Sequence, residues 1–509
     1  MEYKKEFNYS FLMLTTLIIS GCSIIYEVLI SSVSSYLVGD SIKQFSITIG
    51  LYMSAMGLGS YISKYIKKNL FDWLAFVELG VGVIGGLSSL ILFLSNAYLS
   101  SYQLIMYVEI ILIGTLVGLE IPLLTRIIEG NTKDLRVTLS SIFSFDYIGG
   151  LIGSIAFPLL LLPSLGYFTT AFLTGSVNIV ISIFIIYKYK KHIVNLNIFK
   201  FCSIVLLIIM SLGAVFSDNI ANNIENNLYR DKVILKKQTQ YQNIVMTKHK
   251  DDLRLFINGN LQFSTLDEYR YHECLVHIPM KVSPQKENIL ILGGGDGMAA
   301  REILKYDEVK NITLIDLDKD MVELCKTNSD VVDVNKGSLS NEKLNVINSD
   351  AYKYLEESSG IYDVIIIDLP DPNDENLNKL YTDVFYRLAG NHLSETGVMS
   401  IQSTSPYYAK KAFWCINKTI EGEGFNVIPY HVQVPSFGDW GFQLVSKKPI
   451  DVTNIDTSDL ETRFLNNDTV KRLFVFSEDE KEDKEKLLAN KLSRPQLMTY
   501  YLEAVSDWR

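Results

Sequence analysis

One stretch decides the fold of the C-terminal half of this chain: Asn288-Ile289-Leu290-Ile291-Leu292-Gly293-Gly294-Gly295-Asp296-Gly297. Its first five residues have the composition of a buried strand, and a glycine-rich turn then leads into a helical stretch from Met298. Further strands are expected at 311–317, 344–347 and 362–367. Strands that alternate with helices predict a doubly wound parallel sheet of the α/β class, Rossmann-like as in methyltransferases.

Acidic side chains stand where these strands end. Asp316 lies at the end of the second strand, Asp350 follows the third, and Asp368 follows the fourth. Because ligands of such sheets bind outside the carboxyl ends of the strands, we expect these side chains to share one site. Gly293 and Gly295 let the backbone pass close to a nucleoside, and Asp316 can accept hydrogen bonds from ribose hydroxyls. The sequence therefore predicts nucleoside binding.

Asp296 lies inside the glycine-rich turn and narrows the choice of ligand. A carboxylate there disfavours a pyrophosphate, which needs neutral or positive surroundings. It also repels the amino-acid carboxylate of S-adenosylmethionine and attracts the ammonium of the decarboxylated form. Decarboxylated S-adenosylmethionine is therefore the predicted co-substrate. A methyltransferase that uses S-adenosylmethionine shares this sheet and is the alternative.

A small β-hairpin subdomain is expected before the sheet. Strand-like sequence occupies 233–235, 241–246, 253–257 and 261–263. Asn258-Gly259 separates the last two runs, and this dipeptide is a strong signal for a tight hairpin turn.

Seven apolar stretches occupy the N-terminal half, at 10–34, 44–63, 73–95, 102–125, 138–163, 166–187 and 201–217. Most are near the roughly 20 residues that a membrane-spanning helix needs. The first has no small-residue cleavage site, so it is predicted as a membrane helix rather than a removed signal. An α-helical multi-pass domain in the cell membrane is the prediction.

Basic residues in alternate loops mark the cytoplasmic side of this domain. They are Lys4 and Lys5, then Lys64, Lys67 and Lys68, then Arg126, Lys133 and Arg136, then Lys188, Lys190, Lys191 and Lys200. Seven crossings from a cytoplasmic N-terminus would place the C-terminal half outside, away from amine and sulfonium substrates made in the cell. We expect a cytoplasmic domain, which requires that a stretch such as the short 201–216 does not cross.

Five carboxylates lie within the apolar stretches, where an ionised group costs at least about 2.5 kcal/mol at the bilayer centre. They are Glu27, Glu78, Glu109, Glu120 and Asp146. Hydrogen bonds between helices, or protonation, are the expected solution, and a cavity for cations is the alternative.

Charge and cysteine content exclude two classes of function. The net charge of −10 divides into +1 for residues 1–220 and −11 for residues 221–509, so a basic footprint for nucleic acid is absent. The five cysteines are scattered and form no CxxC pair, which predicts neither a zinc site nor a disulfide framework.

Several motifs, taken in order over about residues 230–445, resemble those of the spermidine synthases, or polyamine aminopropyltransferases. They are Thr239-Gln240-Tyr241-Gln242-Asn243-Ile244, Asp267-Glu268-Tyr269-Arg270-Tyr271-His272-Glu273, the loop at 293–297, and Asp368-Leu369-Pro370-Asp371-Pro372. Membrane-fused members of that family are also similar in Gly438-Asp439-Trp440-Gly441-Phe442 and in the apolar half.

The resemblance implies a role for each matching residue. The adenosyl portion would be held by Gln242, Gly293, Gly295, Asp316, Asp350 and Ala351. The amine ends would meet His272 and Asp296, with Tyr271 and Asp371 along the amine channel, and Asp368 would be the proton acceptor. The resemblance also implies transfer of an aminopropyl group to an amine such as putrescine, no metal or permanently bound cofactor, and a homodimer.

Three departures from the family pattern concern mainly the acceptor. The stretch after Asp371 reads Pro372-Asn373-Asp374-Glu375, the usual glutamate of the second strand is Asp316, and Val434-Pro435-Ser436-Phe437 stands where a tyrosine normally reaches the amine. The adenosyl side is therefore the better matched, and the sequence leaves the acceptor amine open.

The expected organisation is a membrane domain at 1–220, a catalytic domain at 225–450, and a charged, helical tail at 451–509 whose function the sequence does not indicate. A membrane sensor or transporter whose soluble domain only binds its ligand is the non-enzymatic alternative.

Overall fold

The computed structural model describes residues 9–38, 41–99, 102–132, 134–229 and 231–508. The chain forms two compact units, Met1–Asp231 and Lys232–Arg509. Three of the lysines used above to assign the cytoplasmic side, Lys4, Lys5 and Lys133, lie outside the described residues.

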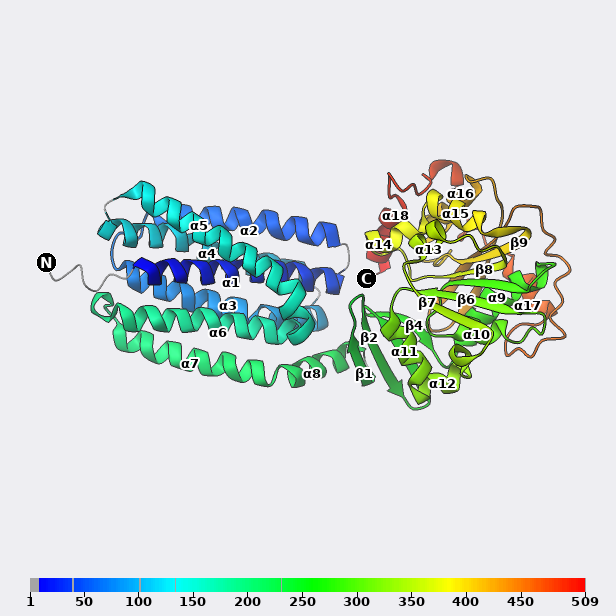
Figure 1. Cartoon of the computed structure of the whole chain (residues 1–509), viewed down its shortest axis with the longest axis horizontal. Coiled ribbons are helices and arrows are strands. Elements are labelled where there is room, and N and C mark those ends of the chain that lie inside the picture. The colour runs from blue at the N-terminus through cyan, green and yellow to red at the C-terminus, as the bar shows by residue number, and fades with distance from the viewer. Residues whose placement is uncertain (1–8, 39–40, 100–101, 133, 230, 509) are drawn as a thin grey trace. The chain divides into compact units, whose positions relative to one another are not determined.

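The first unit is helical (Figure 1). Its α-helices are α1 (Tyr9–Val38), α2 (Ser41–Ser63), α3 (Leu70–Tyr98), α4 (Tyr102–Thr132), α5 (Leu135–Ala156), α6 (Leu162–Lys188), α7 (Leu196–Val215) and α8 (Ser217–Tyr229). A π-helical turn, Phe157–Leu161, joins α5 to α6, and Lys190–His192 forms a 3₁₀ turn.

Six helical segments of the described chain are long and apolar enough to cross a membrane. They are Tyr9–Val38, Ser41–Ser63, Leu70–Tyr98, Tyr102–Gly130, Leu135–Lys188 and Leu196–Val215. The fifth has 54 residues, nearly three times what one crossing needs. Its backbone leaves the helical region at Gly166, where φ is 70° and ψ is −178°, and the chain reverses direction between α5 and α6 (Figure 1).

Glycines bring helix backbones of this unit into direct contact. A Cβ at Gly59 of α2 would lie 2.0 Å from the Thr115 carbonyl oxygen of α4, and one at Gly118 of α4 would lie 2.1 Å from that of Met56. Small residues that permit such close approach stabilise helix pairs in lipid, where apolar burial contributes little.

The carboxylates of the apolar stretches differ in their partners. Glu78 is 0% exposed and its Oε2 accepts from Asn178 Nδ2 at 2.9 Å, while Asn178 Oδ1 accepts from the Tyr26 hydroxyl at 3.1 Å. This chain of hydrogen bonds links α3, α6 and α1, as expected for interhelical bonding. Glu109 and Glu120 are 4% and 3% exposed and have oxygens without a hydrogen-bond partner among the described residues.

The second unit begins with a four-stranded antiparallel sheet of order β1-β2-β3-β4. Its strands are β1 (Lys232–Gln238), β2 (Asn243–His249), β3 (Asp252–Ile257) and β4 (Asn260–Ser264). Asn258 and Gly259 turn β3 into β4 with φ of 48° and 81°, the left-handed values that a two-residue hairpin turn requires.

A seven-stranded sheet follows, of order β10-β11-β9-β8-β5-β6-β7. Its strands are β5 (Asn288–Gly293), β6 (Asn311–Asp316), β7 (Leu344–Asn348), β8 (Tyr362–Asp368), β9 (Leu393–Gln402), β10 (Asn426–Val434) and β11 (Gly438–Ser446). Strands β5 to β9 are parallel, as predicted, whereas β10 and β11 add an antiparallel pair at one edge. The doubly wound prediction did not include that pair.

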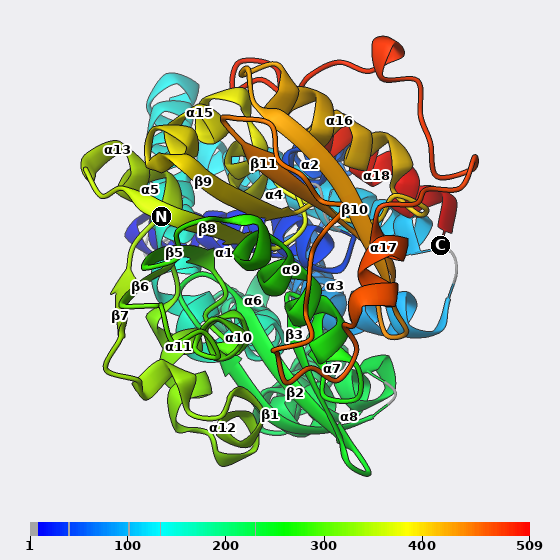
Figure 2. The same cartoon turned by 90° about the vertical axis from the view of Figure 1, so that its right-hand side faces the viewer.

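Helices cover both faces of this sheet (Figures 1 and 2). On one face Ile289 and Ile291 of β5 pack with α9 (Glu268–Val282), α10 (Met298–Ile303), α11 (Lys319–Thr327) and α12 (Ser329–Asn335). On the other, Leu290 and Leu292 pack with α13 (Ala351–Glu357), α15 (Asp383–Asn391) and α16 (Lys410–Glu421). The alternation explains why β5 is apolar at every position.

Residues 451–509 belong to this second unit. They contain α17 (Asn467–Leu473), a 3₁₀ turn at Lys484–Lys486 and α18 (Leu497–Trp508), while the short α14 (Glu375–Asn378) precedes a 3₁₀ turn at Lys379–Tyr381. Leu497 is 0% exposed and packs in the same core as α15 and α16.

Replacement of Gly118 by alanine should destabilise the first unit, because its Cβ would overlap the Met56 carbonyl and force α2 and α4 apart. We expect a cost of about 1–3 kcal/mol, as for other overpacked cores, seen as a lower unfolding midpoint in detergent. Gly57→Ala is the matched control on α2, since no atom lies within 4 Å of its added Cβ. Equal midpoints for the two variants would contradict the backbone contact.

Candidate active site

Asp368 ends β8 at the point where the strand order reverses. It pairs with Gly293, the last residue of β5, whose other neighbour is β6. The Tyr271 hydroxyl of α9 donates to Asp368 Oδ1 at 2.6 Å. Burial raises the pKa of Asp368 to about 6; the charge of His272 opposes the shift, that of Asp296 adds to it, and the Tyr271 hydrogen bond opposes it. A carboxylate with such a pKa can take up a proton near neutral pH.

Two glycines of the loop, Gly293 and Gly295, leave no room for a side chain. A Cβ at Gly293, where φ is 84°, would lie 2.0 Å from the Asp368 carbonyl oxygen, and one at Gly295 would lie 2.5 Å from Asp316 Oδ2. Instead, the Gly295 N–H donates to Asp316 Oδ2 at 3.1 Å. The loop thus aligns Asp316 beside β5.

Asp316 is joined to the β-hairpin subdomain through its neighbour Asp318. The Asp318 N–H donates to Asp316 Oδ1 at 2.9 Å, and the Thr239 hydroxyl donates to Asp318 Oδ2 at 2.7 Å. Thr239 and Gln242 close one turn between β1 and β2, because the Thr239 N–H donates to the Gln242 carbonyl at 2.9 Å. These hydrogen bonds therefore place Gln242 near the carboxyl end of β6.

One side-chain oxygen of Asp296 accepts a hydrogen bond from the start of α10, and the side chain lies near His272 and Asp368. Its Oδ1 accepts from the Met298 N–H at 2.9 Å, while its carbonyl accepts from Asn335 Nδ2 at 2.9 Å. The charge of Asp296 acts on both His272 and Asp368. Asp296 thus shares the end of the sheet with those two side chains.

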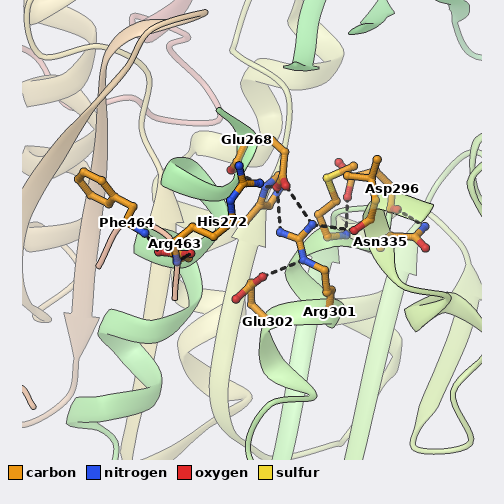
Figure 3. Close-up of polar contacts among 12 residues, drawn as sticks. Glu268, His272, Asp296, Arg301, Glu302, Asn335, Arg463 and Phe464 are labelled. Atoms are coloured by element: carbon orange, nitrogen blue, oxygen red, sulfur yellow. Dashed lines mark hydrogen bonds and ion pairs between the residues drawn. The ribbon is translucent and has the colours of Figure 1, made fainter. Parts of the chain in front are cut away.

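Glu268 is the centre of a buried ionic network (Figure 3). Arg301 Nη1 and Nη2 each donate to it at 2.9 Å, and His272 Nδ1 donates at 2.8 Å. Burial alone would lower the pKa of His272, but the hydrogen bond and charge of Glu268, with the charges of Asp296 and Asp368, raise it to about 9. His272 is therefore an imidazolium at neutral pH.

The network continues away from the site through Glu302. Arg301 Nε donates to Glu302 Oε1 at 2.8 Å, and Glu302 Oε2 lies 2.9 Å from His277 Nε2. His277 Nδ1 in turn lies 3.0 Å from the Tyr306 hydroxyl. These bonds join α9 to α10, so the loop before α10 has a fixed position relative to His272.

Asp350 and Ala351 lie at the start of α13, after β7. Asp350 Oδ1 accepts from the Tyr352 N–H at 2.8 Å, and Oδ2 pairs with Lys379 Nζ at 2.6 Å. Partial burial acts to raise its pKa, but Lys379 and the helix N–H groups hold it below its usual range.

Asp371 follows β8 and is held by neutral donors. Gln402 Nε2 donates to Oδ1 at 3.1 Å, and the Tyr501 hydroxyl donates to Oδ2 at 2.9 Å. Thr404 Oγ1 lies 3.5 Å from Oδ2. Burial raises the pKa of Asp371, and these hydrogen bonds oppose the shift.

The predicted residues thus lie along the carboxyl ends of neighbouring strands of the sheet. Asp371 and Asp368 lie at the end of β8, Asp296 and the glycines at β5, Asp316 at β6, and Asp350 with Ala351 at β7. Tyr271, His272, Asp296 and Asp368 form one electrostatic group. Asp350 has a separate partner, Lys379. The arrangement suits an elongated ligand along the strand ends.

Several residues that hold the site together could not be predicted from the sequence. Glu268 lies in a quoted motif, but no role was assigned to it, and its buried position at the start of α9 becomes meaningful only beside Arg301. Gln402, Lys379 and Tyr501 carried no signal, because each reaches its carboxylate from 29 to 130 residues away.

Comparisons with known proteins decide the family. The polyamine aminopropyltransferase of Leptospira interrogans serogroup Icterohaemorrhagiae serovar copenhageni (strain Fiocruz L1-130) is 42% identical over 490 residues, which cover 96% of this chain and 97% of that protein. The polyamine aminopropyltransferase of Oceanobacillus iheyensis is 40% identical over 495 residues, which cover 96% of each chain. The spermine/spermidine synthase domain matches residues 268–457.

The chain belongs to the spermine/spermidine synthase family. Among solved structures, a spermidine synthase in complex with the transition state analogue AdoDATO is 26% identical, with a TM-score of 0.45 over 48% of this chain and 85% of that chain.

Membership in the spermine/spermidine synthase family confirms the predicted class of enzyme, a transferase of polyamine biosynthesis. The two relatives match nearly the whole chain, so their similarity includes the helical first unit. The family domain match ends at residue 457 and does not include α17 or α18.

The charge of His272 predicts a pH-dependent contribution to stability. Since its folded pKa of about 9 exceeds the unfolded value, the contribution is full below about pH 6.5 and disappears as the pH rises through about 9. At about 1.4 kcal/mol per pKa unit it amounts to at most about 3 kcal/mol. The difference in unfolding midpoint between the wild type and His272→Gln, followed by tryptophan fluorescence in detergent, should shrink from pH 6.5 to pH 9.5. A difference that stays constant would show that folded His272 is neutral.

Proposed function

We propose that this site moves the aminopropyl group of decarboxylated S-adenosylmethionine to a diamine such as putrescine, giving spermidine and methylthioadenosine. The observation that carries the proposal is the buried Asp368, with a pKa of about 6, at the switch point of the sheet and beside Asp296 and His272. Such a carboxylate is the general base that attack by an amine requires.

The proposed reaction is a direct displacement. The amine nitrogen attacks the carbon bonded to the sulfonium, that C–S bond breaks, and its electron pair stays on sulfur to give neutral methylthioadenosine. A polyamine nitrogen is mostly protonated at neutral pH and cannot attack in that form. Asp368 would accept the proton that the nitrogen loses, and Tyr271 would hold the carboxylate in place through its hydroxyl.

Selection of the donor would depend on Asp296 and the neighbouring strand ends. Asp316 is proposed to bind the ribose hydroxyls, with Gly293 and Gly295 against the nucleoside, and Gln242, Asp350 and Ala351 completing the adenosyl site. Asp296 would attract the donor's ammonium and repel the carboxylate of ordinary S-adenosylmethionine, which argues against methyl transfer.

Binding of the acceptor amine would depend on the carboxylate of Asp371, which follows β8. Asp371 is proposed to hold the distal ammonium of the diamine, while His272 and Tyr271 line the amine channel. Holding both substrates in line contributes to the rate through proximity and orientation. The family resemblance also supports a homodimer.

Asp368→Asn should lower turnover by about 10² to 10⁴, the usual contribution of a general base. Methylthioadenosine binding should persist, because the carboxylate faces the amine rather than the nucleoside. Release of methylthioadenosine from decarboxylated S-adenosylmethionine and putrescine measures the first expectation, and calorimetry measures the second. Turnover at the wild-type level would remove Asp368 from the mechanism.

We further propose that the first unit is a multi-pass domain of the cell membrane and that the second unit faces the cytoplasm, where its substrates are made. The six long apolar segments support the membrane assignment. The side depends on α7. The expectation that 201–216 forms only a short stretch was wrong, because the helix extends from Leu196 to Val215, and its 20 residues reach about 30 Å and match a hydrocarbon core. With the basic loops on the cytoplasmic side, a cytoplasmic second unit requires that α7 does not cross completely.

Labelling of single cysteines with an impermeant thiol reagent in intact cells tests this orientation. Lys67→Cys probes the loop after α2, and Lys448→Cys probes the second unit after β11. We expect protection at both positions until the cells are permeabilised. Labelling of position 448 alone in intact cells would mean that α7 crosses and that the second unit faces outward.

A further inference from the structure

Residues 458–508 lie beyond the family domain match and are held to the rest of the second unit at several points. Glu273 accepts from the backbone N–H groups of Arg463, Phe464 and Leu465 at 2.6, 2.9 and 2.9 Å. Further on, His431 Nε2 of β10 donates to the Val475 carbonyl at 2.8 Å. The segment is therefore fixed along its course and is not a loose tail.

Asn490 fixes the point where the segment enters α18. Its side chain is 0% exposed, and its Nδ2 donates to the Tyr381 carbonyl at 3.0 Å. Its Oδ1 accepts from the N–H groups of Gln496 and Leu497 at 2.9 and 3.1 Å. These bonds tie the first turn of α18 to the 3₁₀ turn that follows the loop of Asp371.

Tyr501, in the second turn of α18, uses this fixed position to reach Asp371. Its hydroxyl donates to Oδ2 at 2.9 Å, on the side of the carboxylate opposite to Gln402. Burial raises the pKa of Asp371, and the side chains that oppose this rise by hydrogen bonds, Gln402, Tyr501 and Thr404, are all neutral. The negative charge of Asp371 therefore remains available to a cationic ligand, while its orientation is set by hydrogen bonds.

We propose that Tyr501 is a positioning residue for the acceptor amine: its hydroxyl holds the Asp371 carboxylate in the orientation that binds the distal ammonium. The inference rests on the proposed function, in which Asp371 meets that ammonium. It assigns a role to the C-terminal segment, which thereby forms part of the amine site. A displaced carboxylate would bind the ammonium less well and would hold the attacking nitrogen less precisely.

Tyr501→Phe in the full-length protein tests the proposal. The variant keeps the ring that packs α18 and removes only the hydroxyl, so Asp371 loses one donor. We expect about tenfold weaker binding of putrescine by calorimetry with methylthioadenosine present, and a similar rise in its KM, as for a lost hydrogen bond to a charged group. The KM of decarboxylated S-adenosylmethionine and the affinity for methylthioadenosine should not change.

The pH dependence of the KM for the amine distinguishes this role from a merely structural one, which would leave it unchanged. Loss of a donor raises the pKa of Asp371 further, so the ratio of the amine KM values, variant to wild type, should be larger at pH 6 than at pH 8. Tyr500→Phe is the matched control on the next residue of α18. Its hydroxyl accepts from the Leu488 N–H at 3.3 Å, and the structure gives it no bond to Asp371.

The outcomes separate this inference from the proposed function. Unchanged amine affinity in Tyr501→Phe, or an equal loss in Tyr500→Phe, would overturn the role of Tyr501 even where the wild type turns over normally. A wild type that neither binds putrescine nor releases methylthioadenosine would overturn the proposed function, and the positioning role with it.

Discussion

One buried carboxylate, Glu268, joins α9, which carries Tyr271 and His272, to α10, which follows the glycine loop. It begins α9, accepts two hydrogen bonds from Arg301 of α10, and fixes His272 one turn further along its own helix. Because α10 follows the glycine loop directly, this ionic contact sets the position of Asp296 relative to Tyr271 and Asp368. Removal of one partner from a buried ion pair typically costs about 3–5 kcal/mol. The relative positions of Asp296, Tyr271 and Asp368 therefore depend on the ion pair between Glu268 and Arg301.

The charges of the site favour cationic ligands. Asp316 and Asp368 both have pKa values raised to about 6, chiefly by burial, and Asp296 adds negative charge to both. Against them the imidazolium of His272 acts on Asp368. A sulfonium and an ammonium that enter together would supply the missing positive charge and lower the pKa of the carboxylates they meet. Binding of the proposed substrates would thus keep Asp368 ionised until it accepts the reaction's proton.

Much of the fold and part of the site could be predicted from local sequence. The run at 288–297 indicated strand, turn and helix, and Asn258-Gly259 indicated the hairpin, because each depends on backbone preferences of adjacent residues. The antiparallel pair β10–β11 was missed, although a tight turn joins the two strands: the Phe437 N–H donates to the Val434 carbonyl at 2.9 Å, and Gly438 has φ of 88°. The place of this pair beside β9, by contrast, is decided by packing. Glu268 with Arg301, and Asp371 with Gln402 and Tyr501, depend on contacts across long sequence separations, which one sequence does not reveal.

In the sequence, Val434-Pro435-Ser436-Phe437 was one of the stretches that resembled the family least, and the structure shows what surrounds Phe437. The Phe437 ring packs edge-on against Tyr271 with centroids 6.1 Å apart, and the Ser436 N–H and hydroxyl donate to Asp267 at 2.6 and 2.7 Å. Residue 437 therefore supplies an apolar wall and no hydroxyl. Thr404 and Tyr501 supply hydroxyl groups to the Asp371 carboxylate. Tyr501 lies outside the matched family domain, so one of the groups that orient Asp371 belongs to a segment that the shared motifs do not include.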